Sequence, residues 1–386
     1  MKCLSTKATS IKPSGIRKFF DLASTMEGVI SLGVGEPDFA TPWHICENAI
    51  HYMSTGHTHY TANRGLLELR EEICKFHKEH YNQVYDPENE VIVTIGGSEA
   101  IDLCMRALLN PGDEVIVLDP NYVAYAPSVI LSDGVVVPLK LKEENDFKII
   151  PEDLKKVITP KTKAMIINYP SNPTGGVMTK EDYAKIIDII KESGIYVISD
   201  EIYAELSFDQ PFASLAQFDE IKSQIIVVNG FSKAYAMTGW RLGYCMANKE
   251  LSSVMNKIHQ YVIMSAPVMS QYAGIEAIKN GYNDVLMMKD DYLKRRNFLV
   301  NRLNRMGLKT NMPHGTFYVF CNIQSTGLDS ETFCERLLQE QKVACVPGNA
   351  FGNSGEGYVR ISYAYSIDHI KEAVVRLEQF LKDLDN

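Results

Sequence analysis

Short apolar runs alternate with longer helical stretches between residues 90 and 230 of the chain. The apolar runs are rich in β-branched residues and show no alternation with polar residues, which is typical of strands buried on both faces of a sheet. These runs are 90–95, 114–118, 164–168, 195–199 and 225–229. Because strands and helices alternate, the pattern predicts an α/β fold with a mostly parallel central sheet and crossover helices.

One of the intervening stretches, 181–193, has the period of an amphipathic helix. Its apolar face consists of Tyr183, Ile186, Ile187 and Ile190. Thr179 and Asp182 form a capping-box pattern before this stretch, and Gly194 is placed to end it. The sequence therefore predicts one helix over the whole segment.

The pattern changes after about residue 280. A charged helical stretch at 286–306 is followed by aromatic or β-branched strands at 315–322 and 357–362. The chain ends in an amphipathic helix with apolar positions at Ile370, Val374, Leu377, Leu381 and Leu384. A chain of 386 residues is too long for one ordinary core. We therefore expect a large domain at 41–280 and a smaller α+β domain at 281–386, with 1–40 forming an N-terminal arm that belongs to the small domain.

Composition narrows the classes of partner. The formal net charge of -9 disfavours binding to a nucleic-acid backbone, although local sites for small anions remain compatible with it. The sequence contains no run of about 18 apolar residues, so it predicts no membrane span. The eight cysteines show no C-x-x-C pairing, which indicates free thiols in a reducing cytoplasm. The histidines form no H-E-x-x-H motif, so we expect no metal site.

Candidate chemistry follows the predicted strands, since ligands of parallel α/β sheets bind at the carboxyl ends of the strands. The segment 96–100 (GGSEA) follows the first run and opens a helix, so its glycines and free N–H groups suit a phosphate. A plain strand-to-helix turn explains the same residues. The segment contains neither a P-loop nor a dinucleotide-binding glycine motif.

Two further strands end in polar side chains. Asn172 lies in the turn 169–176 after the third run, between two prolines that fix the backbone. Asp200 and Tyr203 follow the fourth run, and a buried carboxylate requires a cation or a donor beside it. The alternatives are a structural Asn-Pro turn for Asn172 and a helix N-cap for Asp200.

A lysine and an arginine follow the last run. Lys233 is either an ordinary surface lysine or a buried amine whose lowered pKa makes it nucleophilic. Arg241, eight residues later, suits bidentate binding of a phosphate. Pyridoxal phosphate requires a lysine for its aldehyde, an acid for its ring nitrogen and ligands for its phosphate. The residues at these strand ends together match that cofactor.

The segment 231–243 (FSKAYAMTGWRLG) resembles the lysine signature of class I aminotransferases of fold type I. The resemblance extends over nearly the whole chain. Further segments in the order of that family are 35–39 (GEPDF), Tyr60, 64–65, 69–70, 172–175 (NPTG) and 358–360 (YVR). The segments 14–20 and 229–233 resemble a subgroup that includes N-acetyl-diaminopimelate, aromatic and aspartate aminotransferases.

The resemblance implies a role for each matching residue. Lys233 holds pyridoxal phosphate as a Schiff base, and Asp200 pairs with the ring nitrogen. Asn172 and Tyr203 bind the ring oxygen, and Tyr122 stacks on the ring. The phosphate ligands it implies are Gly97, Ser98, Glu99, Ser232 and Arg241, together with Tyr60 from the neighbouring subunit of a homodimer. The substrate contacts it implies are Arg360, which clamps the α-carboxylate, the backbone of Gly35, Asn172, and the arm near Ile16.

One position departs from the family pattern. Many relatives have a serine three residues before the lysine, where it donates to the phosphate, and this chain has Gly230. A hydrogen bond to the cofactor is therefore lost or replaced by water. The property that this change affects is the affinity for the cofactor.

The expected reaction moves an amino group from an L-amino acid to a 2-oxo acid such as 2-oxoglutarate, with Lys233 acting as base and then as acid. The resemblance implies aspartate, an aromatic amino acid or a diaminopimelate-like compound as the donor. Two alternatives stay open: a C–S β-lyase on the same scaffold, and a non-catalytic regulatory protein that binds the cofactor. Release of pyruvate and ammonia without an oxo acid would identify the lyase.

Overall fold

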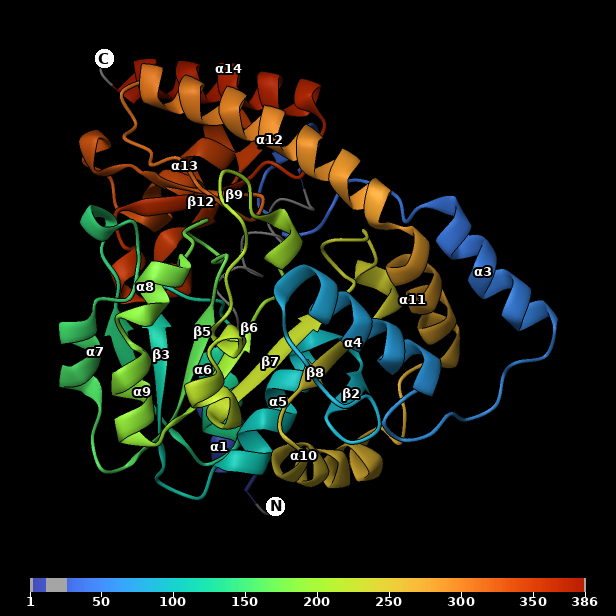
Figure 1. The fold of residues 1–386 in the computed structure, drawn as a ribbon. Coiled ribbons are helices and arrows are strands. Elements are labelled where there is room, and N and C mark those ends of the chain that lie inside the picture. Colours follow the sequence, from blue (N-terminus) through green and yellow to red (C-terminus); the bar gives the residue numbers. More distant parts are fainter. Residues whose placement is uncertain (1–2, 12–25, 385–386) are drawn as a thin grey trace.

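The computed structural model describes residues 3–11 and 26–384, and its large domain is built on a seven-stranded sheet in the order β2-β8-β7-β6-β5-β3-β4 (Figure 1). The strands are β2 (Val91–Thr94), β3 (Glu114–Asp119), β4 (Val135–Lys140), β5 (Thr162–Asn168), β6 (Tyr196–Asp200), β7 (Ile225–Gly230) and β8 (Gly243–Met246). All neighbouring strands are parallel except at β8, which runs antiparallel to both β7 and β2. The predicted α/β class with a mostly parallel sheet is confirmed.

Helices cover both faces of this sheet, which explains why its strands carry no polar alternation. One face packs against α5 (Gly96–Leu108), α6 (Tyr125–Leu131) and α10 (Lys249–Val262). The other face packs against α3 (Trp43–Ser54), α4 (Leu67–Tyr81), α7 (Pro151–Val157), α8 (Lys180–Ala184), α9 (Ile187–Ser193) and α11 (Val268–Asn280). The carboxyl ends of β5, β6 and β7 therefore meet at one edge between the two helical layers.

The sequence pattern missed two strands of the sheet. β4 contains Pro138 and begins with the exposed residue Val135, as an edge strand can. The proline interrupts the apolar run by which a buried strand is recognised. β8 has only four residues and lies between β7 and β2. It is the strand that places Arg241 beside the end of β7.

The prediction of one helix over 181–193 is wrong. The predicted capping box at Thr179 and Asp182 is present, and Gly194 ends the second helix at φ 67°. The break lies at Lys185 and Ile186, whose N–H groups bond to the carbonyls three residues earlier. This tighter turn separates α8 from α9, although the predicted apolar face stays in the core.

The small domain packs three helices against a three-stranded sheet of β11 (Val346–Pro347), β12 (Tyr358–Ser362) and β9 (Tyr318–Asn322). The helices are α12 (Tyr282–Arg305), α13 (Ser330–Gln341) and α14 (Ile367–Leu384). Figure 1 shows α12 running from beside α11 to the far end of the molecule, where it lies along α14. The predicted strands and helices of this half of the chain are present with shifted ends.

The described N-terminal segments contact both domains. β1 (Ile30–Ser31) pairs in parallel with β10 (Val343–Ala344) of the small domain. In contrast, α1 (Thr6–Ser10) contacts α6 of the large domain, where Lys7 Nζ lies 2.7 Å from Asp133 Oδ2. The stretch 26–32 thus lies against the small domain as an arm would, whereas α1 does not. The domain boundaries at 40 and 280 stay a prediction.

Candidate active site

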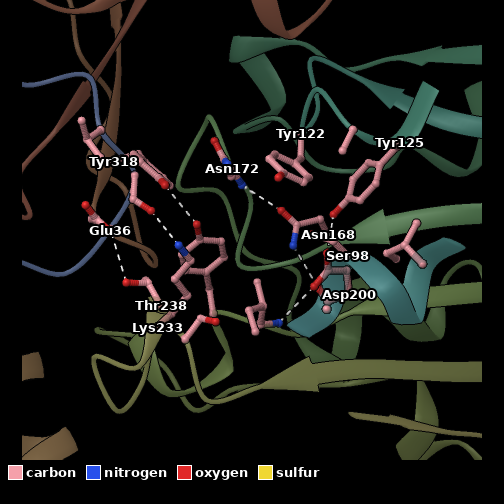
Figure 2. A pocket seen from close by; sticks show the side chains of 18 of the residues that line it. Glu36, Ser98, Tyr122, Tyr125, Asn168, Asn172, Asp200, Lys233, Thr238 and Tyr318 are labelled. Carbon is pink, nitrogen blue, oxygen red and sulfur yellow. Dashed lines mark hydrogen bonds between the residues drawn. The ribbon is translucent and has the colours of Figure 1, made fainter. Parts of the chain in front are cut away.

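A cavity of about 430 Å³ opens at the carboxyl ends of β5, β6 and β7, beside the small-domain strands β9 and β12. Figure 2 shows Lys233 and Tyr318 on one side of it, and Tyr122, Tyr125 and Asp200 on the other. The predicted site residues that line the cavity are Gly35, Gly97, Ser98, Tyr122, Asn172, Asp200, Tyr203, Ser232, Lys233, Arg241 and Arg360.

Lys233 follows the end of β7 and points into this cavity. Its Nζ donates to the carbonyl oxygen of Gly35 at 2.6 Å. Removal from bulk water lowers the pKa of Lys233 to about 8, and the positive charges of Arg360 and Arg241 act in the same direction. A larger fraction of this amine is therefore neutral and nucleophilic at neutral pH than of an ordinary lysine.

Asp200 is the last residue of β6 and is buried. Tyr125 donates to its Oδ2 at 2.7 Å, and the N–H of Ile202 donates to its Oδ1 at 3.2 Å. Burial raises the pKa of Asp200 to about 6, and these donors only partly offset that cost. A carboxylate held in this state gains strongly from a cationic partner, such as a protonated ring nitrogen.

The first turn of α5 and the guanidinium of Arg241 form a cradle for an anion. A side chain at Gly96 would lie 2.8 Å from Arg241 Nη2, and one at Gly243 would lie 2.5 Å from the carbonyl carbon of Gly96. Glycine at these positions therefore lets the helix N-terminus, the strand β8 and the guanidinium approach closely. Free N–H groups and a positive charge in this arrangement suit a phosphate.

The side chain of Glu99 is not among the cavity-lining groups. Its Oε2 accepts from the N–H of Ile95 at 2.5 Å, and its Oε1 lies 2.6 Å from Nδ1 of the buried His259. A carboxylate would repel a phosphate, and here it binds beneath the first turn of α5 instead of facing the cavity. The main-chain N–H of Glu99, in the first turn of α5, stays the predicted ligand for the anion.

The departure at Gly230 has a steric explanation. Gly230 pairs with Gly243 across β7 and β8. A Cβ at Gly230 would lie 3.0 Å from Gly243 Cα and 3.1 Å from Ile202 Cδ1. Both contacts are tighter than ordinary van der Waals packing, so a serine here would displace its neighbours. Gly230 therefore fits the close packing of these two strands.

Arg360 reaches the cavity from β12 of the small domain and is buried. Its Nη1 donates to Asn172 Oδ1 at 2.9 Å, and its Nη2 donates to Gly33 O at 2.6 Å. Its Nε is buried without a hydrogen-bond partner. A buried, incompletely paired guanidinium is suited to bind a carboxylate in the cavity.

The two predicted ring contacts, Tyr122 and Tyr203, both line the cavity. Tyr122 lies edge-to-face on Tyr125 with ring centroids 5.5 Å apart, and burial raises the pKa of Tyr122. The phenol oxygen of Tyr203 lies 3.0 Å from that of Tyr318. Burial also raises the pKa of Tyr203 well above its ordinary value, so its phenol stays protonated and can donate.

Two further predicted residues are not among those that line the cavity. Tyr60 is outside the cavity, and its side chain is 84% exposed. Ile16 lies outside the described residues.

Among the cavity-lining residues that were missed from the sequence are Tyr125, Asn168 and Tyr318. Asn168 donates to Asp200 O at 3.0 Å and accepts from the N–H of Asn172 at 2.9 Å, so it joins two strand ends. Its position as the last residue of a predicted strand was an available signal. Tyr125 and Tyr318 gave no such signal, because their roles depend on contacts with distant parts of the chain.

The residues present fit pyridoxal phosphate. Lys233 would supply the amine for its aldehyde, Asp200 would supply the acid for its ring nitrogen, and the cradle with Arg241 would hold its phosphate. In the described part of the chain, no group of three or more His, Cys, Asp or Glu side chains could hold a metal ion. Within residues 3–11 and 26–384, no helix has the length and apolar character needed to span a membrane.

Comparison with known proteins gives the same result. The family model "Aminotransferase class I and II" matches residues 27–377. "Putative aminotransferase YugH" of Bacillus subtilis (strain 168) is 50% identical, with 98% of each chain covered. "Probable N-acetyl-LL-diaminopimelate aminotransferase" of the same organism is 42% identical, with 98% of this chain and 95% of that protein covered.

Solved structures agree with these relatives. The crystal structure of an aromatic aminotransferase from Pyrococcus horikoshii OT3 matches with a TM-score of 0.91 and 43% identity, over 95% of this chain and 99% of that one. The chain therefore belongs to the class I and II aminotransferase family, with fold type I. It is a pyridoxal-phosphate-dependent aminotransferase, and the assignment made from its sequence is confirmed.

Proposed function

We propose that this enzyme transfers the amino group of an L-amino acid to a 2-oxo acid such as 2-oxoglutarate, and that Lys233, Asp200 and Tyr203 perform the chemistry. The observation that carries the proposal is that the amine of Lys233 and the guanidinium groups of Arg241 and Arg360 enter one cavity. The cavity therefore offers a nucleophile between two separate anion sites, one for a phosphate and one for a carboxylate.

Each part of the site then has one task. Pyridoxal phosphate, when bound, supplies the aldehyde that captures amines and the ring that takes up the electron pair from the substrate Cα. The Nζ of Lys233 removes the Cα proton and afterwards, as an ammonium group, donates it, so one group acts as both base and acid. Its lowered pKa supports this double use, because the amine and the ammonium form are both accessible near pH 8.

The remaining residues bind and orient. Arg360 holds the α-carboxylate of the amino acid, assisted by the backbone of Gly35 and by Asn172. Asn172 and Tyr203 donate to the ring oxygen of the cofactor, and Tyr122 covers its ring. The ligands proposed for its phosphate are Gly97, Ser98, Ser232, Arg241 and the N–H of Glu99. These assignments rest on the positions of the side chains around the cavity.

The donor is proposed as aspartate, an aromatic amino acid or a diaminopimelate-like compound. The two relatives named above for a substrate, an aromatic and an N-acetyl-diaminopimelate aminotransferase, support two of these classes. The arm near Ile16 is proposed to contribute to this choice.

A donor screen tests the function. Purified protein with pyridoxal phosphate is offered each amino acid in turn with 2-oxoglutarate, and glutamate is measured. We expect glutamate to form with at least one of the three proposed donor classes. Each reaction is repeated without the oxo acid, since pyruvate and ammonia in that case would indicate the lyase instead. Absence of glutamate with every donor would contradict the proposal.

The active unit is proposed as a homodimer with shared sites. Tyr60, Tyr261 and Met264 are large side chains that are 84%, 87% and 45% exposed. Asn63 Nδ2 donates to Met264 O at 2.8 Å, so the loop that carries Tyr60 lies beside the end of α10, where Tyr261 is located. Exposed side chains of this size on adjoining segments favour a protein interface. Arg241 is also exposed beside its cradle, which leaves room for Tyr60 of a second copy.

Mixed dimers test this arrangement. Tyr60→Phe is expected to weaken cofactor binding about tenfold, because one hydrogen bond to a charged phosphate is lost. When Tyr60→Phe and Lys233→Ala proteins are mixed and re-formed at limiting cofactor, the hybrid contains one site with both native residues. Activity should then exceed the sum of the two separate proteins. Tyr261→Phe in place of Tyr60→Phe is the matched control, and equal behaviour of the two variants would contradict a shared site.

A cytoplasmic location is also proposed. All eight cysteines lie in the described part of the chain and are free thiols. Cys334 and Cys345 are buried free thiols whose sulfurs are in hydrogen-bond contact at 3.4 Å and are not joined by a disulfide. Thiols in this state are compatible with a reducing compartment.

A further inference from the structure

Tyr318 contacts three parts of the active site that come from distant parts of the chain. It is the first residue of β9, is buried, and lines the cavity (Figure 2). Its phenol meets Tyr203 from the large domain, its ring meets Arg360 from β12, and its oxygen occupies the space beside Gly35. The proposed chemistry assigns no task to Tyr318, although it contacts three residues that have one.

The hydrogen bond between Tyr203 and Tyr318 has a defined donor if Tyr203 donates to the cofactor. A phenol has one proton to donate. If Tyr203 donates that proton to the ring oxygen, its own oxygen is left as an acceptor, and Tyr318 is 3.0 Å away to donate to it. Hydrogen bonds in such a chain polarise one another, so the donation from Tyr318 strengthens the donation from Tyr203.

The second contact is between the ring of Tyr318 and the guanidinium of Arg360. The guanidinium carbon lies 4.3 Å from the ring centroid of Tyr318 and 4.7 Å from that of Phe351. Arg360 thus contacts two aromatic rings while its Nη atoms bond to Asn172 and Gly33. A buried cation gains more from such ring contacts than an exposed one does.

The third contact explains why residue 35 has no side chain. A Cβ at Gly35 would lie 2.1 Å from the phenol oxygen of Tyr318. Glycine therefore allows the carbonyl of this residue to reach Lys233 at 2.6 Å while Tyr318 keeps its place. The backbone that bonds to the catalytic amine and the ring that supports Arg360 are packed against each other.

We propose that Tyr318 is a positioning residue that links the arginine for the substrate carboxylate to the phenol that binds the cofactor ring oxygen. The inference deepens the proposed function and rests on it. The phenol group acts on the cofactor through Tyr203, whereas the aromatic ring acts on the substrate through Arg360. The two actions reside in different atoms of one side chain and can be separated by two substitutions.

Tyr318→Phe removes the phenol group and keeps the ring. The ring oxygen of the cofactor shares a proton with the nitrogen bonded to Lys233, and weaker donation from Tyr203 leaves that proton more firmly on the nitrogen. The pH at which the absorbance of the bound cofactor changes should therefore rise by about 0.5 pH units. Binding of 3-phenylpropanoate, a carboxylate without an amine, should stay within about twofold of wild type, because Arg360 keeps both rings. Tyr363→Phe is the control, since it also removes a buried phenol hydrogen bond, at 2.9 Å to Thr316 O, outside the cavity.

Tyr318→Leu removes the ring as well. The dissociation constant of 3-phenylpropanoate, followed through the cofactor absorbance, should rise about tenfold. Phe351→Leu removes the second ring that contacts Arg360 and should weaken this ligand too, without moving the pH of the absorbance change. Circular dichroism establishes that each variant is folded, and Tyr318→Phe carries the test if the leucine variant is not.

The outcomes separate the inference from the function on which it rests. An absorbance titration of Tyr318→Phe that overlays wild type would overturn the inference and leave the aminotransferase assignment intact. An equal shift in Tyr363→Phe would overturn it as well. Wild-type protein that shows no absorbance from a cofactor bound to Lys233 would overturn both.

Discussion

Lys233→Ala is expected to lower the rate of amino transfer by about 10⁴-fold or more, because the base, the acid and the attachment point of the cofactor are lost together. The amine lies inside the cavity, with its Nζ 2.6 Å from Gly35 O. No other lysine lines the cavity among the described residues, so none can take over the proton transfer. Turnover with the best donor and the absorbance of the covalently bound cofactor are the two measurements.

Controls separate this effect from a general loss of structure. Lys185→Ala removes an exposed lysine, paired at 3.2 Å with Asp182, and should leave both readings unchanged. Added methylamine should restore part of the activity of Lys233→Ala, because a small amine fits the space left by the side chain. After reduction with borohydride, the wild-type cofactor should be found on the peptide that contains residue 233. Undiminished turnover in Lys233→Ala would rule out its role.

Strand ends were the part of the site that the sequence could predict. Buried parallel strands have a clear signature, and their carboxyl ends must meet at one edge of the sheet. Asp200 and Lys233 could thus be placed at neighbouring strand ends from the apolar runs, while a helix N-cap and a surface lysine stayed open as alternatives. The resemblance then added Arg360, which comes from the other domain and which no local pattern connects to these strands.

Contacts between distant segments could not be predicted in this way. Tyr125 lies 75 residues from Asp200 and Tyr318 lies 115 residues from Tyr203 along the chain, yet each pair shares a hydrogen bond. Glu99 shows the same limit, because its place in a phosphate motif did not predict where its side chain points. Its direction was decided by His259 on α10 and by the N–H of Ile95, neither of which the motif contains.

The small domain contributes more to the site than its size suggests. Arg360 lies on β12 and Tyr318 lies on the adjacent strand β9. Arg360 pairs with Phe320 and Ser362 pairs with Tyr318, so Arg360 and Tyr318 are diagonal neighbours across the two strands. Their partners Asn172 and Tyr203 belong to the large domain. A change in how the two domains pack would therefore alter carboxylate binding and the phenol link together.

Asp200→Asn is expected to lower kcat/KM by about 10³-fold, while the cofactor still attaches to Lys233. Burial raises the pKa of Asp200 to about 6, so its charge is costly unless a protonated ring nitrogen compensates it. A neutral amide can still accept from Tyr125 but cannot hold a proton on that nitrogen. The electron pair from the substrate Cα then lacks a charged ring to receive it, and steady-state kinetics with the best donor would measure the loss.

Glu201→Gln is the matched control, because Glu201 is the adjacent residue and an equally buried carboxyl group. Its Oε1 accepts from Ser199 at 2.8 Å and from Ser214, and it does not line the cavity. Burial raises the pKa of Glu201 to about 7, so the group is partly protonated near neutral pH and glutamine is a close substitute. Its kcat/KM should stay near wild type. Equal losses in the two variants would show that buried charge in this strand, and not contact with the cofactor, explains the effect of Asp200.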